Sequence, residues 1–341
     1  MRAHSCRARL LVLAGATVAM CPAASDAQAA SQRRPQRAPL AFVSNEGSRD
    51  VSIVDLATLT VIASIPVRER PRGIQTSADR TRVFVALSDD VPTKQSPGDA
   101  IAIIDVATRT LVGRYSSGTD PEQFGVTSDG RKLYASNEDA GTASAIDVRT
   151  GKVLATLVVG IEPEGVAVGP DDRFVYVTAE TSNTVSVIDT RRDEVVANFL
   201  VDPRPRAVAF SRDSRRAYVT AEIGGTLAVV DARTHEVLRS VDLGPGDPKP
   251  VGVAVAPDGR LVYVANGGTS DVAVIDPEAG RVVARIAVGR RPWGITLSPD
   301  GRRAYTANGL SNDISVIDLA TRRVIAKVAV GKRPWGVAIV P

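Results

Sequence analysis

The sequence predicts an all-β protein, a seven-bladed β-propeller built from four-stranded antiparallel blades. Two observations lead to this fold class. A unit of about 42 residues occurs seven times, and each unit consists of short alternating runs, rich in Val and Ile, separated by turn residues. The units begin at residues 41, 83, 133, 175, 217, 262 and 304. Four short strands per repeat at this period are typical of propeller blades.

Within each unit the four predicted strands follow a fixed order. In the fourth unit the first run is VYVTA at 175–179 and the second is VSVID at 185–189. A third run follows, such as RVVARIAV at 281–288 in the sixth unit, and a fourth comes after an x-Pro-x step, such as GITLS at 294–298. Alternation of apolar and polar residues indicates strands, and turn signals such as PDG at 257–259 separate them.

The chain ends in the middle of a unit, which predicts how the ring closes. Residues 331–341, GKRPWGVAIVP, nearly copy GRRPWGITLSP at 289–299. The last copy therefore supplies a fourth strand with no first three strands of its own, whereas residues 41–66 supply three strands with no fourth. We expect these two segments to pair, so that both ends of the chain close the ring.

Residues 1–29 are predicted to be a secretory signal peptide. Arg2, Arg7 and Arg9 come before an apolar run from Leu10 to Met20, and the small residues that follow include an A-x-A pattern at 27–29. This order of basic, apolar and small residues is that of a secretory signal. We therefore expect cleavage after Ala29, a polar linker over 30–40, the propeller over 41–341, and a periplasmic or secreted protein.

Cysteine usage and charge exclude several classes of function. Both cysteines, Cys6 and Cys21, lie in the predicted signal, so the mature chain has no disulfide and no thiolate site. The alternative is a lipoprotein anchored at Cys21, although the preceding Met20 fits such a site poorly. The apolar run is too short to span a bilayer, so no membrane span is expected in the mature chain.

Removing residues 1–29 takes away three arginines and one aspartate, and the formal charge falls from +4 to +2. No excess positive charge is left to indicate nucleic-acid binding.

Several phrases of the propeller resemble a known family. VYVTA and VYVAN resemble the repeat of the YVTN β-propellers, a seven-bladed, WD40-like family, and the similarity covers residues 41–341. The phrases RPRGIQTS, DPEQF, EPEGVAV, AEIGGTLAVVD, NGLSNDISVID and RPWGV, in that order, are similar to one exported subfamily. That subfamily is associated with pyrroloquinoline-quinone (PQQ)-dependent alcohol catabolism and an ABC transporter. The resemblance implies an exported binding or scaffold protein, accessory to periplasmic PQQ-dependent catabolism, whose partner is a periplasmic dehydrogenase or a transporter component.

Residues that recur in every unit are interpreted as scaffold. An aspartate ends each second run, where its carboxylate is expected to accept hydrogen bonds from the backbone of the following turn. These aspartates are Asp55, Asp105, Asp147, Asp189, Asp231, Asp276 and Asp318. An aromatic residue in each first run is expected to pack between blades. These aromatic residues are Phe42, Phe84, Tyr134, Tyr176, Tyr218, Tyr263 and Tyr305.

The residues that flank the proline of each x-Pro-x step differ between units and are therefore candidate site residues. The steps are expected to surround one mouth of the central channel, because each leads into an innermost strand. The flanking residues predicted to bind a ligand are Arg72, Glu122, Glu164, Arg206, Arg291, Trp293, Arg333 and Trp335. Arginines suit carboxylates or phosphates, and the two tryptophans, the only ones in the chain, suit an aromatic molecule. We expect a small anionic or aromatic ligand at this mouth, or a protein partner.

The loops between the first and second runs are expected at the same mouth. Their first acidic residues are Glu46, Asp89, Glu138, Glu180 and Glu222, and of these all but Asp89 complete the predicted binding set. The last two units place Gly267 and Gly309 there instead, which would leave room for a flat ligand against the indoles. Insertions within 88–100 and 244–250 extend loops of this mouth, either as a lid or partner contact or as tolerated surface insertions. The simpler alternative is that the arginines and glutamates only pair with each other and the tryptophans plug the channel.

Catalysis and metal binding find less support in the sequence. The mature chain has one histidine, His235, predicted to lie exposed in a turn at the opposite mouth. Haem ligation by histidines, a histidine zinc site and Ser-His-Asp chemistry are therefore disfavoured. The acidic residues of the loops between first and second runs could bind Ca²⁺, but no compact D-x-D-x-D loop is present. No catalytic residue, metal or cofactor is predicted. Two alternative functions stay open: a carboxylate-dependent enzyme of the lyase or lactonase type, with Glu122 or Glu164 as the acid–base group, and single-stranded DNA binding, which needs a basic aromatic groove.

Overall fold

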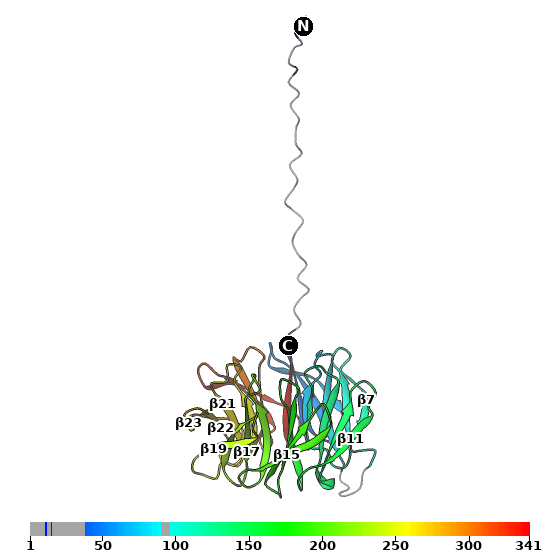
Figure 1. Cartoon of the computed structure of the whole chain (residues 1–341). Coiled ribbons are helices and arrows are strands. Elements are labelled where there is room, and N and C mark those ends of the chain that lie inside the picture. The colour runs from blue at the N-terminus through cyan, green and yellow to red at the C-terminus, as the bar shows by residue number, and fades with distance from the viewer. Residues whose placement is uncertain (1–10, 12–14, 16–37, 90–95) are drawn as a thin grey trace, which may run out of the picture. The chain divides into compact units, whose positions relative to one another are not determined.

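Seven four-stranded antiparallel sheets stand around a central channel as the blades of a propeller (Figure 1). The computed structural model describes residues 11, 15, 38–89 and 96–341, of which Ala38–Pro341 form one compact unit. The predicted fold class is confirmed, and the first strand begins at Leu40. Apart from residues 11 and 15, the predicted signal peptide lies outside the described residues, and so does most of the linker. In the described part of the chain, no helix is long and apolar enough to cross a membrane.

Each blade runs from an inner strand at the channel to an outer strand at the rim. The blade that holds both chain ends consists of β28 (Pro334–Val340), β1 (Leu40–Asn45), β2 (Asp50–Asp55) and β3 (Thr60–Pro66). The next two are β4 (Arg70–Thr76), β5 (Arg82–Ser88), β6 (Ala100–Asp105) and β7 (Thr110–Ser116), then β8 (Phe124–Val126), β9 (Lys132–Asn137), β10 (Thr142–Asp147) and β11 (Val153–Val158). A short 3₁₀ helix, η1 (Glu138–Ala140), joins β9 to β10.

The remaining four blades repeat the same order of strands. They are β12 (Pro163–Val168), β13 (Phe174–Ala179), β14 (Thr184–Asp189) and β15 (Glu194–Leu200), then β16 (Pro205–Phe210), β17 (Arg216–Ala221), β18 (Thr226–Asp231) and β19 (Glu236–Asp242). After them come β20 (Pro250–Val255), β21 (Val262–Asn266), β22 (Asp271–Asp276) and β23 (Arg281–Ala287), and finally β24 (Pro292–Leu297), β25 (Arg303–Asn308), β26 (Asp313–Asp318) and β27 (Arg323–Ala329).

The two ends of the propeller close the ring as the sequence predicts. β28 pairs antiparallel with β1, in a register that sets Leu40 opposite Val340 and Ser44 opposite Gly336. The side chains of this junction join the cores of both neighbouring blades, because Val340 packs in one buried cluster and Val337 in another. The last strand of the chain is therefore a structural member of the first blade.

In several blades the inner strands approach each other so closely that only glycine fits after the x-Pro-x step. A Cβ on Gly252 of β20 would lie 2.5 Å from the carbonyl oxygen of Trp293 on β24. A Cβ on Gly294 of β24 would lie 2.7 Å from the carbonyl oxygen of Trp335 on β28. The narrow channel that results contains a cavity of about 210 Å³, lined by residues of all seven inner strands.

Both scaffold predictions are confirmed. Asp55 accepts hydrogen bonds from the backbone N–H groups of Ala57 and Thr58 at 2.8 and 3.0 Å, and the six equivalent aspartates bind their own turns in the same way. The seven aromatic residues of the first runs each pack in a core cluster with residues of the following blade. In one such cluster the buried Tyr176 of β13 contacts the blade that contains Val208 and Val219.

Each outer strand carries a bulge at the same position. Val187 pairs with Ala197 and Ile188 with Val195, so that Val196 of β15 is left without a partner residue on β14. The same register shift occurs in the other six blades. The residues skipped in this way are all apolar: Ile62, Val112, Leu154, Val196, Leu238, Val283 and Ile325. All except Val283 are exposed large hydrophobic side chains. Such a bulge bends the strand and increases its twist.

Hydroxyl groups on the second strand of four blades tie one blade to the next. The buried Thr178 of β13 donates a hydrogen bond to the carbonyl oxygen of Arg206 on β16 at 3.0 Å, and accepts one from the Gly165 N–H at 2.8 Å. Ser44, Ser136 and Thr220 donate in the same way to the carbonyl oxygens of Arg72, Glu164 and Val251. These bonds fix the backbone positions from which candidate site residues project.

We expect Thr178→Val to destabilise the propeller by about 1–3 kcal/mol, because the isosteric valine leaves a buried N–H and a buried carbonyl without a hydrogen-bond partner. Urea unfolding followed by circular dichroism would measure the change. The exposed Thr181 provides the control, and Thr181→Val should change the free energy of unfolding by less than about 0.5 kcal/mol. Equal effects of the two substitutions would contradict a structural role for the Thr178 hydroxyl.

Candidate functional site

The x-Pro-x steps and the loops between the second and third strands of the blades meet at one mouth of the channel. In six blades the backbone N–H of a loop residue donates to the carbonyl oxygen of the residue before the proline, at 2.8–3.2 Å. The pairs are Glu46 with Arg333, Glu138 with Asp120, Glu180 with Glu162, Glu222 with Arg204, Gly267 with Lys249 and Gly309 with Arg291. The C-terminus lies at the opposite end of β28, at the top of the propeller in Figure 1, so this mouth faces downward in that view.

The residue after the proline occupies the same position in every blade, and we call these seven residues the mouth ring. They are Arg72, Glu122, Glu164, Arg206, Val251, Trp293 and Trp335. The residues that follow them, such as Gly73, Gln123 and Gly252, line the cavity in the channel. The mouth ring therefore lies at the end of this cavity, and its side chains decide what can enter from this side.

Arg72 is the first of two arginine centres in the mouth ring. Its guanidinium forms an ion pair with Glu122 of the following blade. It also lies 3.8 Å from a carboxylate oxygen of Glu46, on the preceding blade, and 4.0 Å from one of Glu138. Arg72 thus connects three blades through their acidic side chains.

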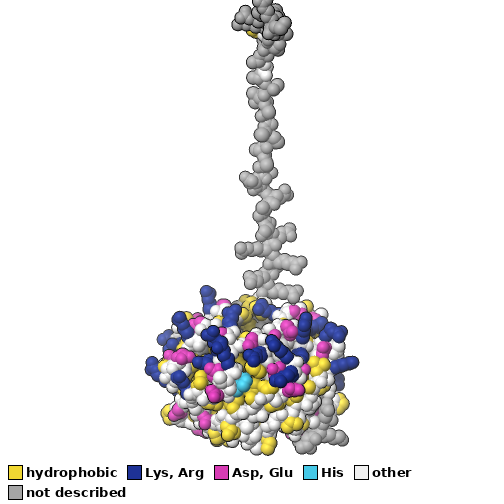
Figure 2. Space-filling model, in the orientation of Figure 1, with side chains coloured by type: hydrophobic (Ala, Val, Ile, Leu, Met, Phe, Trp, Pro, Cys, Tyr) yellow, Lys and Arg dark blue, Asp and Glu magenta, His cyan; other side chains and the backbone are white. Residues whose placement is uncertain are grey.

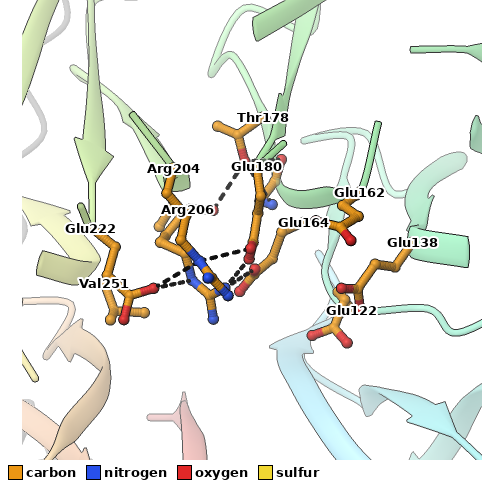
Figure 3. Close-up of polar contacts among 12 residues, drawn as sticks. Glu122, Glu138, Glu162, Glu164, Thr178, Glu180, Arg204, Arg206, Glu222 and Val251 are labelled. Carbon is orange, nitrogen blue, oxygen red and sulfur yellow. Dashed lines mark hydrogen bonds and ion pairs between the residues drawn. The ribbon is translucent and has the colours of Figure 1, made fainter. Parts of the chain in front are cut away.

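Arg206 is the second centre (Figure 3). Its guanidinium contacts Glu180 and lies 2.6 Å from a carboxylate oxygen of Glu164 and 3.6 Å from one of Glu222. Arg204, nearer the solvent, lies 2.9 Å from Glu180 and 3.2 Å from Glu222. The side chains of Arg206 and its three glutamates are each less than a tenth exposed. Buried charges of this kind are tolerated only when each has a partner of opposite sign.

Two glutamates of the mouth have raised pKa values. Burial raises the pKa of Glu164, and Arg206 acts in the opposite direction. Burial also raises the pKa of Glu138 to about 7, and the negative charge of Glu164 adds to this effect. Glu138 and Glu164 therefore hold protons at a higher pH than ordinary glutamates do.

The two tryptophans stack on each other rather than on an open surface. Their ring centroids are 6.5 Å apart at an interplanar angle of 14°, and the guanidinium carbons of Arg291 and Arg206 lie 4.6 and 5.2 Å from the centroid of Trp293. A Cβ on Gly309 would lie 2.7 Å from Cδ1 of Trp293. The glycine thus makes room for the chain's own indole, which corrects the expectation that it leaves space for a flat ligand.

The remaining predicted residues lie nearer the rim of the same mouth. Arg333, 65% exposed, lies 3.9 Å from Glu46, and Arg291 forms an ion pair with Glu222 at 3.1 Å. The side chain of Arg291 also lies 3.3 Å from where a Cβ on Gly267 would be, so this glycine too faces the chain's own side chain. The structure therefore brings all the predicted site residues to one mouth, where each predicted arginine already contacts a carboxylate.

Both insertions reach this mouth. In the first, residues 90–95 lie outside the described part of the chain. On either side of them the Asp89 N–H donates to Oδ1 of Asp99 at 3.1 Å, and burial raises the pKa of Asp99. In the second, Lys249 forms an ion pair with Asp247 at 3.0 Å.

His235 lies at the opposite mouth, in the turn between β18 and β19, as its place in the repeat predicts. Its Nδ1 is 2.7 Å from the hydroxyl of Tyr176, and its ring packs at a right angle to Phe174, with centroids 4.7 Å apart. It is partly buried rather than fully exposed as expected, because the preceding blade supplies two aromatic rings that pack against it. Burial lowers its pKa.

The face that surrounds the mouth exposes large apolar side chains, which the sequence comparison between units did not single out. Ile161 lies before β12, and Ile223 and Leu310 lie in loops between second and third strands, with exposed fractions of 61%, 68% and 56%. Val158 and Leu200, at the ends of outer strands that reach the same face, are also exposed. Figure 2 shows Lys and Arg side chains gathered over the upper part of the view, whereas hydrophobic ones are more evident below. In the sequence, an apolar residue inside a turn, as in EIGG and NGLS, would have indicated these exposed side chains.

Comparison with known proteins supports the fold. The model of the family described as "Lactonase, 7-bladed beta-propeller" matches residues 202–327, and no curated protein matches the chain. Hydrazine synthase of Kuenenia stuttgartiensis is 22% identical, with a TM-score of 0.71 over 82% of this chain and 92% of that one. A proposed 6-phosphogluconolactonase of Bacteroides fragilis is 18% identical, with a TM-score of 0.72 over 89% and 98%. A second, from Bacteroides uniformis, is 18% identical, with a TM-score of 0.73 over 89% and 100%.

At these identities the similarity concerns the architecture, since unrelated functions share one fold. The segment matched by the lactonase model, 202–327, contains Arg204, Arg206, Glu222 and Arg291 and so supplies one side of the mouth. By its seven blades and by these comparisons, the chain is a member of the β-propellers, with a partial similarity to the lactonase type.

Proposed function

We propose that this propeller is a binding protein that docks a protein partner on the face surrounding the mouth. The observation that carries the proposal is the exposure of Ile161, Ile223 and Leu310 around a mouth whose predicted arginines already contact carboxylates. Exposed apolar side chains around a polar centre are typical of protein interaction sites. A small anionic ligand would have to displace buried glutamates from Arg72 or Arg206, at a high cost in free energy.

The class of partner follows from the resemblance of the sequence. An exported propeller similar to the PQQ-associated subfamily would meet a periplasmic quinone-dependent dehydrogenase or a component of an ABC transporter. The export itself depends on the predicted signal at residues 1–29. The predicted arginines of the mouth are each paired with a neighbouring carboxylate, which favours a protein partner over single-stranded DNA.

Site-specific photocrosslinking in the native host tests the docking face. A photoreactive amino acid at position 223 or 310 should form a discrete adduct with one partner protein. Leu238 on the outer strand β19 is the matched control, because it is also apolar and 46% exposed but lies on the rim. Adducts that are absent from positions 223 and 310, or equally strong at 238, would contradict the proposal. With the photoreactive amino acid at position 223, Leu310→Lys should weaken the adduct, and with it at position 310, Ile223→Lys should do the same. Neither lysine substitution should change the melting temperature.

Lactone hydrolysis is the second candidate function, and the partial match to the lactonase model favours it. Ring opening by water needs a carboxylate that accepts a proton and a cation that stabilises the developing oxyanion. Glu164, with its raised pKa, and Arg206 beside it are the pair that would supply these roles. Purified protein should then hydrolyse sugar δ-lactones, and Glu164→Gln should lower kcat by at least about 100-fold. Absence of turnover by the wild-type protein would exclude this candidate and leave the docking proposal unaffected.

A further inference from the structure

Three acidic residues converge beside Arg72. Asp120 precedes the proline of its x-Pro-x step, Glu122 follows it in the mouth ring, and Glu138 opens η1 in the adjoining loop of the same blade. One carboxylate oxygen from each of the three lies within 4.8 Å of the other two. The backbone bond from the Glu138 N–H to the Asp120 carbonyl, at 3.2 Å, holds the loop and the step together. The convergence is therefore built into the backbone of this blade.

A buried oxygen in this group lacks a partner. Glu122 is fully buried, and its Oε1 faces the guanidinium of Arg72. Its Oε2 has no hydrogen-bond partner among the described residues. Figure 3 shows the carboxylates of Glu122 and Glu138 close to each other. An ionised carboxylate oxygen that is shielded from water and unpaired is costly, and such a group in a native fold calls for an explanation such as an ion.

The local charges leave an excess of carboxylates. Arg70 lies 3.7 Å from Glu46 and 3.5 Å from Asp120, and Arg72 contacts Glu122, Glu46 and Glu138. Among the residues that the structure describes, four carboxylates thus share two close arginines. A further arginine, Arg333, is 65% exposed and lies 3.9 Å from Glu46. A cation is the species that would complete this charge balance.

We propose that Asp120, Glu122 and Glu138 hold a divalent cation, and that calcium fits the site best. All three ligands are oxygens, which hard cations prefer. Calcium–oxygen distances are about 2.3–2.6 Å, so ligand atoms on opposite sides of one calcium ion are about 4.8 Å apart. The three observed oxygens fall within this span. Magnesium demands a tighter shell, with distances of about 2.0–2.1 Å. The cation would stiffen the loop after β9 against the mouth ring.

Isothermal titration of the chelator-treated, full mature protein with calcium chloride tests the site directly. We expect one saturable site per chain and weaker binding of magnesium. Asp120→Asn, at a partly exposed position, should weaken calcium binding by at least about tenfold, because affinity follows the number of charged ligands. Glu122→Gln should do the same. Circular dichroism of both variants would show that the loss does not come from unfolding.

Glu162→Gln is the matched control. Glu162 precedes the proline of the next blade, in the position equivalent to Asp120, but it does not belong to the acidic group. Its substitution should leave calcium affinity within about twofold of the wild type. The proposal is overturned if no saturable heat appears up to about 10 mM calcium, or if Asp120→Asn and Glu162→Gln bind as tightly as the wild type. These outcomes do not depend on whether a protein partner docks at the mouth.

Discussion

Arg206→Ala is expected to destabilise the propeller by about 3–5 kcal/mol, since removing one member of a buried ion pair leaves its partners as uncompensated charges. Glu164 and Glu180 would lose their buried cation, and neither side chain is exposed by more than 4%. Denaturant unfolding of the variant measures the loss. The cation–π contact of Arg206 with Trp293 would be lost as well, so intrinsic fluorescence should report the same substitution.

Arg204→Ala is the matched control for this prediction. Arg204 contacts Glu180 and Glu222, but its side chain is 44% exposed, and exposed ion pairs contribute at most about 1 kcal/mol. Similar losses in the two variants would mean that burial does not govern the energy of this network.

The loss of stability caused by Arg206→Ala should also depend on pH. Burial already raises the pKa of Glu164, and loss of Arg206 removes the largest of the positive charges that oppose this rise. The folded variant would then bind more protons than the unfolded chain, so its stability decreases as the pH rises. We expect the difference from the wild type to shrink when the pH is lowered from about 7 to about 5. A difference that does not change over this range would contradict protonation of the freed glutamates.

Deletion of residues 334–341 is expected to abolish cooperative folding. This segment is β28, and without it the first blade loses its inner strand and the ring loses its closure. Burial of Trp335, Val337 and Val340 contributes roughly 1.5–3 kcal/mol for each side chain. Their loss, together with the strand pairing, is comparable with the total stability of about 5–15 kcal/mol that is usual for a protein. Calorimetry should show no sharp unfolding transition in the truncated protein.

Deletion of Pro341 alone is the control, because this residue is exposed and follows the last strand. The melting temperature should not change. A truncated chain that still unfolds in one sharp transition, with the wild-type enthalpy, would show that the pairing of the two chain ends is dispensable.

The fold was predictable because the same order of strand patterns and turn residues recurs in all seven units. Comparison between units also separated Asp55, which recurs and binds its turn, from Arg72, which varies and lies at the mouth. The partners within the mouth were not predictable in this way. Arg206 reaches back to Glu164 and Glu180 of the preceding blade, whereas Arg72 reaches forward to Glu122. Which neighbour an arginine meets depends on the angle between blades and on side-chain rotamers, and neither is encoded in a local pattern.

Two other features depend on contacts between blades that lie outside the repeat pattern. Gly309 proved to accommodate the indole of Trp293, and His235 proved to be covered by Phe174 and Tyr176. In both cases the side chain that packs against the residue comes from a distant position in the chain. Trp293 is about 16 residues from Gly309, and Phe174 and Tyr176 are about 60 residues from His235. Tertiary packing therefore overrides the expectation from the local sequence.

The bulge in every outer strand has a consequence for the behaviour of the protein at high concentration. A closed ring still presents one unpaired sheet edge per blade, and an unpaired edge is a template on which strands of other molecules can add. Residues such as Val196 and Leu238 interrupt that template in its middle, because an incoming straight strand cannot match the shifted register. The propeller therefore carries its protection against fibrillar self-association in the backbone of each blade, and not in its charges alone.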